Sequence, residues 1–162
     1  MTSKRLIFAF LLTLVLETSA SAASISASRQ SCIRGAMAAG SAALGNTAQL
    51  NRLYDRYFAG DRIAQIAAGK DWKRYSEAQK DAQRKRARQV IVYNLGSTLA
   101  SYGGSRVQFV SQNGSKVKGV VTAPNGRRST VTWQFVGPCK FVDVSIEGYG
   151  SLVGAIGKVS GK

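Results

Sequence analysis

The spacing of the apolar residues changes once along this sequence, at the pair Gly103-Gly104. Before the pair, apolar residues recur every three or four positions, which predicts helices. After it they alternate in short runs, which predicts strands. Helices in one half of a chain and strands in the other are typical of an α+β fold, in which the helices cover the apolar face of an antiparallel sheet.

Four helices are predicted in the first half. They cover residues 28–44, 48–58, a short segment begun by Asp61, and 76–102. Asn46 and Ser76 are residue types that favour helix starts. Gly35 and Gly40 weaken the first helix. The first half of the last helix is mostly charged, and its second half has an apolar stripe formed by Ala87, Ile91, Leu95, Leu99 and Tyr102.

The second half of the chain predicts four strands joined by tight turns. Asn113-Gly114 is a strong hairpin signal, and Pro124-Asn125-Gly126 marks a second turn. Because the strands follow one another with short connections, we expect a four-stranded antiparallel meander. The strands are predicted at residues 106–111, 116–123, 129–136 and 141–146.

The first 22 residues have the pattern of a secretory signal peptide. Lys4 and Arg5 precede the apolar run Leu6 to Leu16, and Ala20-Ser21-Ala22 is a small-x-small cleavage site. An apolar run of this length is shorter than the roughly 20 residues that a spanning helix needs. An uncleaved anchor or a buried helix is the alternative. We therefore expect residues 1–22 to be a signal peptide and residues 23–162 to be one exported α+β domain.

The mature chain is strongly basic. Loss of Lys4, Arg5 and Glu17 changes the net charge from +15 to +14. In an exported protein this charge favours an anionic membrane surface, an acidic polysaccharide or an acidic protein, and nucleic acid is not expected. One helix carries a dense basic run, interpreted as a docking face for an anionic membrane or a transporter subunit, or else as a solvated face. The run consists of Lys80, Arg84, Lys85, Arg86 and Arg88.

The chain has two cysteines, Cys32 and Cys139, and no histidine. Two thiols without histidine do not complete a tetrahedral metal site, so neither a metal nor another cofactor is expected. In an oxidising compartment we expect one disulfide, with two buried free thiols as the alternative.

Without histidine no Ser-His or Cys-His pair exists, so we expect no enzyme. Asp143 and Glu147 are interpreted as structural carboxylates, with an acid/base pair as the alternative.

Two groups of motifs resemble a known family. The first comprises Arg56-Tyr57-Phe58, Asp61-Arg62-Ile63-Ala64, Gly69, Trp72, Gln79, Tyr93 and Leu99-x-x-Tyr102; the second is the run from Phe141 to Gly148 with Ser151-Leu152. In this order they resemble the MlaC family of Gram-negative bacteria, the periplasmic phospholipid-binding or toluene-tolerance auxiliary proteins. The resemblance covers roughly residues 50–153.

The resemblance implies a soluble phospholipid carrier without chemistry of its own. Its partners would be an inner-membrane ABC transporter complex and an outer-membrane lipoprotein complex. The implied fold packs N-terminal helices on a curved sheet and adds a short C-terminal helix. This chain departs from the family pattern at Ala82, where the family has Phe, and at the inserted Tyr149-Gly150. It also stops sooner, at Lys162. These departures predict a smaller or more open pocket, or a different lipid.

Enclosing acyl chains requires an apolar cavity with a polar mouth. The helix candidates for its lining are Tyr57, Phe58, Ile63, Ile66, Leu95 and Leu99. The strand candidates are Val107, Phe109, Val121, Trp133, Phe135, Val144 and Ile146. The alternative is that these residues fill an ordinary core, with Trp72 as a core anchor and not a cavity plug. In that case the chain would be a basic envelope adaptor that binds a partner protein without lipid.

Overall fold

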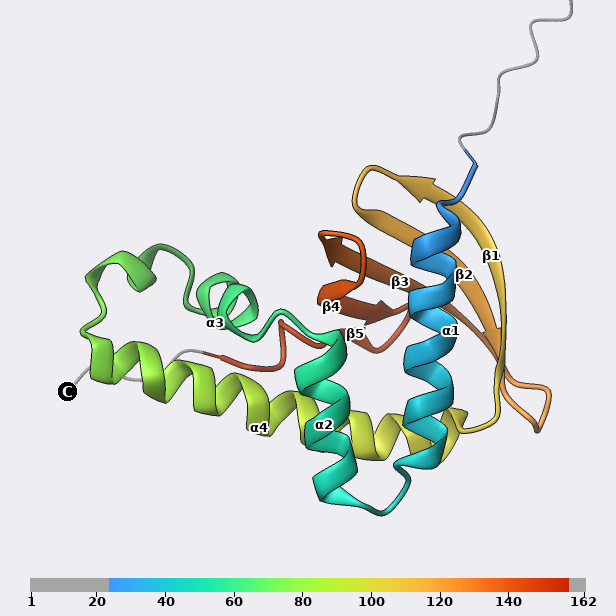
Figure 1. The fold of residues 1–162 in the computed structure, drawn as a ribbon, viewed down its shortest axis with the longest axis horizontal. Helices are drawn as coiled ribbons and strands as arrows, with labels where there is room; N and C mark the ends of the chain where they lie inside the picture. Colours follow the sequence, from blue (N-terminus) through green and yellow to red (C-terminus); the bar gives the residue numbers. More distant parts are fainter. Residues whose placement is uncertain (1–23, 158–162) are drawn as a thin grey trace, which may run out of the picture.

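A computed structural model describes residues 24–157 as a helical half followed by a sheet (Figure 1). The predicted signal peptide lies outside the described residues. The helical half contains α1 (Ala27–Ala42), α2 (Thr47–Tyr57), α3 (Gly60–Ala68), the 3₁₀ helix η1 (Gly69–Arg74) and α4 (Glu77–Tyr102). The sheet contains β1 (Arg106–Asn113), β2 (Lys116–Thr122), β3 (Arg128–Val136), β4 (Lys140–Ile146) and β5 (Gly150–Ser151).

Side-chain caps fix the starts of two helices at the positions that the sequence predicts. The Asn46 side chain accepts a hydrogen bond from the Gln49 backbone N–H at the start of α2. At the start of α4, Ser76 and Gln79 form a capping box, in which each side chain accepts a hydrogen bond from the other residue's backbone N–H. Such caps satisfy backbone donors that a helix start leaves without partners.

The two glycines that weaken α1 as a helix are explained by packing. A Cβ atom added at Gly40 would lie 2.6 Å from Leu99 Cδ2 of α4, and one added at Gly35 would lie 2.9 Å from the Tyr57 hydroxyl of α2. Glycine therefore lets side chains of α2 and α4 approach the backbone of α1, and the close packing offsets the lower helix propensity.

The strands pair in the order β1-β2-β3-β4-β5, and every pair is antiparallel. The register shifts once after Phe109 in β1 and once after Gln134 in β3. Irregularities of this kind increase local twist and bend a strand, and the sheet is strongly curved (Figure 1). The expected α+β meander on a curved sheet is confirmed.

Two details of the expected fold are wrong. The sheet has a fifth, short strand, and residues 152–156 form turns where a short C-terminal helix was expected. Gly148 and Gly150 have φ values of 83° and 93°, which let the chain reverse after β4. The Leu152 N–H then donates to the Val144 carbonyl, and Val153 N–H donates to the Asp143 carboxylate. Pairing with β4 thus holds this segment to the sheet edge instead of allowing a helix.

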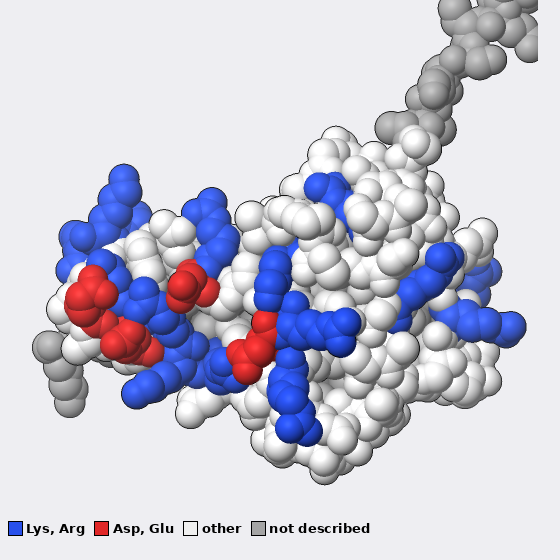
Figure 2. Space-filling model, in the orientation of Figure 1, with Lys and Arg blue, Asp and Glu red and all other residues white. Residues whose placement is uncertain are grey.

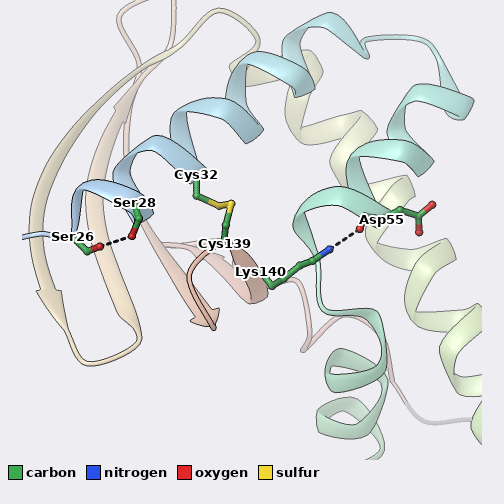
Figure 3. Close-up of a disulfide and its surroundings, with 6 residues drawn as sticks. All are labelled: Ser26, Ser28, Cys32, Asp55, Cys139 and Lys140. Carbon is green, nitrogen blue, oxygen red and sulfur yellow. Dashed lines mark hydrogen bonds between the residues drawn. A yellow bond between two sulfur atoms is a disulfide. The ribbon is translucent and has the colours of Figure 1, made fainter.

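The start of β4 is fastened to the helical layer at successive residues (Figure 3). Cys139, just before the strand, forms a disulfide with Cys32 of α1, and their Cα atoms are 5.5 Å apart. The ammonium of the next residue, Lys140, donates to the Asp55 backbone carbonyl of α2 at 2.7 Å. The expected disulfide is therefore present in the structure.

Phe141 makes the third of these attachments. The Ala59 N–H, between α2 and α3, donates to the Phe141 carbonyl at 2.9 Å, and Phe58 forms an isolated parallel bridge with Phe141. The Phe141 ring packs edge-on against Phe58 and Phe135, with centroid distances of 5.4 and 5.0 Å. We call residues 139–141 and their helix partners the β4 junction.

The helices meet the sheet unevenly. The backbones of α2 and α3 approach β4, whereas the closest backbone neighbours of α4 are α1, α2 and α3. The first half of α4, together with α3 and η1, projects to one side of the sheet (Figure 1). The second half of α4 passes beside α1 and α2. There the side chains of α4, and not its backbone, approach the sheet.

Replacing both Cys32 and Cys139 with serine is predicted to lower the free energy of unfolding by about 2–4 kcal/mol. The disulfide closes a loop with a sequence separation of 107 residues, and closure of a loop that long restricts the unfolded chain strongly. Urea unfolding of the double variant and the oxidised wild type measures the difference. Two reactive thiols per chain in denatured, unreduced wild type would contradict the disulfide itself.

Candidate functional site

An apolar cavity of about 420 Å³ lies between the helices and the curved sheet. This volume is within the range of pockets that hold small molecules. The deep part of its wall is made of side chains that are at most 6% exposed. These buried lining residues are Ile33, Leu53, Phe58, Val121, Val131, Trp133 and Phe141.

The rim of the cavity is polar and open to solvent. Exposed Ser97 and Ser101 of α4 lie on the rim, with Arg127 from the turn between β2 and β3 and Tyr149 from the turn between β4 and β5. Tyr149 is 72% exposed. An apolar interior with a polar rim suits an amphipathic ligand whose tails are buried and whose polar end stays hydrated.

Seven of the predicted lining residues do line the cavity. They come from the end of α2, the second half of α4 and the inner face of the sheet: Phe58, Leu95, Leu99, Val121, Trp133, Val144 and Ile146. The agreement arises because most of these residues lie on α4 or on the inner face of the sheet, and these two surfaces border the cavity. The apolar stripe in the second half of α4 thus faces the cavity at Leu95 and Leu99.

Six predicted residues lie outside the cavity wall. They are Tyr57, Ile63, Ile66, Val107, Phe109 and Phe135. Helix α1 explains two of them, because the guanidinium of Arg34 stacks on the Phe109 ring at 5.0 Å and that of Arg29 on the Phe135 ring at 5.2 Å. The space over these two rings is therefore filled by α1.

The other four residues have different surroundings. Tyr57 and Ile63 are buried in the core, at 5% and 0% exposure. Val107 is half-buried and packs against the same core. Ile66 is 41% exposed, so it faces solvent. Periodicity correctly places the first three on apolar faces, but it does not separate the part of a core that is filled from the part that is hollow.

Sequence reasoning missed the contribution of α1 and of the C-terminal turns. Ile33, Ala36 and Met37 of α1 line the cavity, and so do Leu152 and Ala155 after β5. The spacing of Ile33, Ala36 and Met37 places them on compatible faces of this helix, but the many alanines and glycines give only a weak apolar stripe that does not indicate a cavity wall. Tyr102 was placed on the apolar stripe of α4 but was not proposed as a lining residue, although its side chain reaches the rim.

Two other sequence features are now placed. Trp72 packs against the edge of the core and is not among the cavity-lining residues, so it does not plug the cavity. Asp143 accepts hydrogen bonds from the Ser151 hydroxyl at 2.6 Å and the Val153 N–H at 3.1 Å. Its carboxylate thereby fixes the segment after β4, which agrees with a structural role and not with an acid/base pair.

Ion pairs occupy much of the basic run on α4. Arg84 pairs with Asp61 of α3 at 2.9 Å and with Asp81 at 2.6 Å, and its pKa is raised chiefly by the hydrogen bond to Asp81. Arg88 pairs with Asp55 of α2. On the face seen in Figure 2, acidic groups accordingly lie beside basic ones. These arginines hold α2 and α3 to α4.

The remaining basic residues of the run differ in their contacts. Lys80 pairs with Glu77 at 2.8 Å. Arg86 donates to the Ile156 carbonyl at 2.6 Å and so helps to attach the C-terminal segment to α4. Lys85 is exposed, and no described residue forms an ion pair or hydrogen bond with its side chain. Lys85 is therefore the member of the run whose charge is freest for an external partner.

A helical layer fastened to one edge of a curved antiparallel meander, with an apolar cavity between them, defines an α+β protein with an internal binding pocket. The sequence profile described as "MlaC protein" matches residues 35–154, most of the chain. The chain therefore belongs to the MlaC family. None of the described helices is long and apolar enough to cross a bilayer.

A solved structure has a similar fold. It is the phospholipid-binding protein from Ralstonia solanacearum, determined in complex with a phospholipid, which aligns with a TM-score of 0.62 at 18% sequence identity. The alignment covers 78% of this chain and 81% of that protein. No curated protein sequence matches this chain significantly. Membership of the MlaC family points to a binding protein.

Reversing the charge of Arg84 and Arg88 together, as Arg84→Glu with Arg88→Glu, is predicted to destabilise the fold by about 1 kcal/mol. The change removes ion pairs between α4 and both α2 and α3, and exposed or half-exposed pairs contribute a few tenths to 1 kcal/mol each. Lys85→Glu is the matched control and should change stability by less than about 0.5 kcal/mol. Thermal unfolding of both variants tests this.

The same variants test docking to a membrane. If the run also binds an anionic surface, Lys85→Glu weakens sedimentation with phosphatidylglycerol vesicles at low salt while the melting temperature is unchanged, because a basic residue near such a surface contributes about 1 kcal/mol. Unchanged vesicle binding by Lys85→Glu would show that this charge serves only solubility.

Proposed function

We propose that this protein is an exported carrier that holds the acyl chains of a phospholipid in its cavity and moves them between the inner and outer membranes. The observation that carries the proposal is the apolar cavity of about 420 Å³ in a chain of the MlaC family. Exposing an acyl chain to water costs about 0.8 kcal/mol per methylene. A protein that carries a lipid through an aqueous space needs such an enclosed apolar volume.

The similar solved structure supports the choice of ligand, because that protein is named for phospholipid binding and contains a phospholipid. The predicted signal peptide supports action in the periplasm. In line with the family resemblance, the partners would be an inner-membrane ABC transporter complex and an outer-membrane lipoprotein complex. The open rim lies between α4 and the turns of the sheet. A lipid would enter and leave the cavity through this rim.

An adaptor that binds only a partner protein is the competing function. A filled core would favour it, and so would a basic run with uncompensated charge. The hollow part of the core favours carriage, and three of the five basic residues of the run are ion-paired, which leaves Lys85 and Arg86 without an acidic partner among the described residues. Extraction of lipid from protein purified out of the periplasm, followed by mass spectrometry, tests carriage directly; protein free of phospholipid would favour the adaptor.

A pair of tryptophan substitutions distinguishes the cavity from the filled core. Val144→Trp is predicted to reduce co-purified phospholipid at least several-fold with little change in stability, because Val144 lines the hollow volume. Phe135→Trp is predicted to lower stability by about 1–3 kcal/mol, because Phe135 is 3% exposed and sits beneath Arg29 and against Phe141, so that a larger ring overpacks the site.

Bound lipid and melting temperature are measured together on both variants. The decisive comparison is the lipid content of folded Val144→Trp with that of wild type. If Val144→Trp retained a full complement of lipid, the acyl chains would have to lie elsewhere and this cavity would not be their site.

A further inference from the structure

The lining of the cavity contains a single charge. Among the described residues of the wall, Arg127 is the only one with an ionisable acidic or basic group that is charged at neutral pH. It lies on the exposed rim, in the turn between β2 and β3. An isolated arginine at the mouth of an otherwise apolar cavity has no part in enclosing acyl chains, so its position calls for a different role.

Two tyrosines hold the Arg127 guanidinium in place. Its Nη2 donates to the Tyr102 hydroxyl at 2.7 Å and to the Tyr149 hydroxyl at 3.2 Å. The guanidinium carbon also lies 5.1 Å from the centroid of the Tyr102 ring and 5.6 Å from that of the Tyr149 ring. Cation–π contacts and hydrogen bonds together restrict an otherwise flexible side chain.

The supporting tyrosine Tyr102 is itself anchored. Its hydroxyl lies 2.7 Å from the Ser129 hydroxyl of β3, which connects the end of α4 to the sheet. The pKa of Tyr102 is lowered chiefly by this hydrogen bond with Ser129, and further by Arg127, against the opposing effect of partial burial. The rim thus contains a chain of polar contacts that runs from β3 through Tyr102 to Arg127.

The held guanidinium still has donors to offer. A guanidinium has five N–H groups, and the two on Nη2 suffice for the tyrosine hydroxyls. Within residues 24–157, no acceptor is recorded for Nε or Nη1, and no carboxylate pairs with Arg127. The rim therefore presents a held, uncompensated guanidinium whose Nε and Nη1 hydrogens are available to an external acceptor.

We infer that Arg127 is the headgroup-recognition residue of this protein and binds the phosphodiester of a phospholipid whose acyl chains occupy the cavity. Hydrogen bonds from a guanidinium to phosphate oxygens are charge-assisted and are stronger than bonds between neutral groups. In a phospholipid the phosphate is only a few bonds from the ester carbonyls, so acyl chains lodged in the cavity leave it at the rim. The rim hydroxyl of Ser101 on α4 lies in the same opening and suits the ester and glycerol oxygens.

This inference rests on the proposed carrier function, and the experiment separates the two. An apolar fluorescent dye bound in the cavity is displaced by dioctanoyl phosphatidylglycerol, dioctanoyl phosphatidylcholine or dioctanoylglycerol, which share acyl chains and differ in the phosphodiester. Inorganic phosphate and octanoate are added as separate competitors. The proteins compared are wild type, Arg127→Gln, Arg127→Lys and, as a charge-matched control, Arg128→Gln, whose residue is exposed and outside the cavity wall.

Wild type is expected to bind both phospholipids about tenfold to a hundredfold more tightly than dioctanoylglycerol, the range for hydrogen bonds to a charged group. Arg127→Gln should abolish this difference by weakening phospholipid binding alone. Arg127→Lys should restore part of the difference, since an ammonium keeps the positive charge but lacks the planar guanidinium donors. Arg128→Gln should behave as wild type. Equal melting temperatures show that the variants are folded.

Other outcomes overturn the inference in distinguishable ways. If wild type binds all three dioctanoyl ligands equally, headgroup recognition is refuted while carriage stands. Displacement of the dye by millimolar phosphate alone would make Arg127 a site for the free anion, and preferential displacement by octanoate would make it a carboxylate site. If none of the lipids displaces the dye, the carrier function fails and the inference fails with it.

Discussion

Three successive residues at the start of β4 determine how the helical layer meets the sheet. Cys139 is bonded to α1, Lys140 donates to the end of α2, and Phe141 pairs with the backbone where α2 passes into α3. These attachments are of three kinds, namely a covalent bond, a side-chain hydrogen bond and backbone pairing. All are concentrated at one edge of the layer, so the helices are fixed to the sheet there and need not be closely packed elsewhere.

The cavity follows from this uneven attachment. The long helix α4 is held mainly by α1, α2 and α3, with Leu99 close against the backbone at Gly40, and reaches the sheet through the hydrogen bond between Tyr102 and Ser129 at its end. Where α1 lies on the sheet, its arginines cover Phe109 and Phe135 and the space is filled. Where α4 faces the sheet, the same apolar alternation lines a hollow. One core therefore provides both stability and a binding volume. Helix α1 takes part in both, since Arg29 and Arg34 cover the filled part and Ile33 and Met37 line the hollow part.

Sequence patterns predicted much of the fold but only part of the cavity wall. Caps at Asn46 and Ser76, turn glycines and the change of period at Gly103-Gly104 are local signals, so the helices and four of the strands could be predicted. The fifth strand could not be predicted, because it depends on hydrogen bonds that residues 151–153 donate to Asp143 and Val144 of β4. Seven of the thirteen predicted residues line the wall. Apolar periodicity identifies inward faces, whereas the hollow depends on how far apart two elements stand. Whether Arg84 and Arg88 are paired likewise depends on acids of other helices.

The two cysteines have a consequence for how the molecule is assembled. Chains emerge N-terminus first, so in an oxidising compartment Cys32 meets oxidants while α2, α3, α4 and three strands are still to follow. Because the sequence contains only two cysteines, no wrong partner exists within the same chain. An early error at Cys32 must join it to a different molecule, so misoxidation of this protein produces covalent dimers or mixed disulfides and not scrambled monomers.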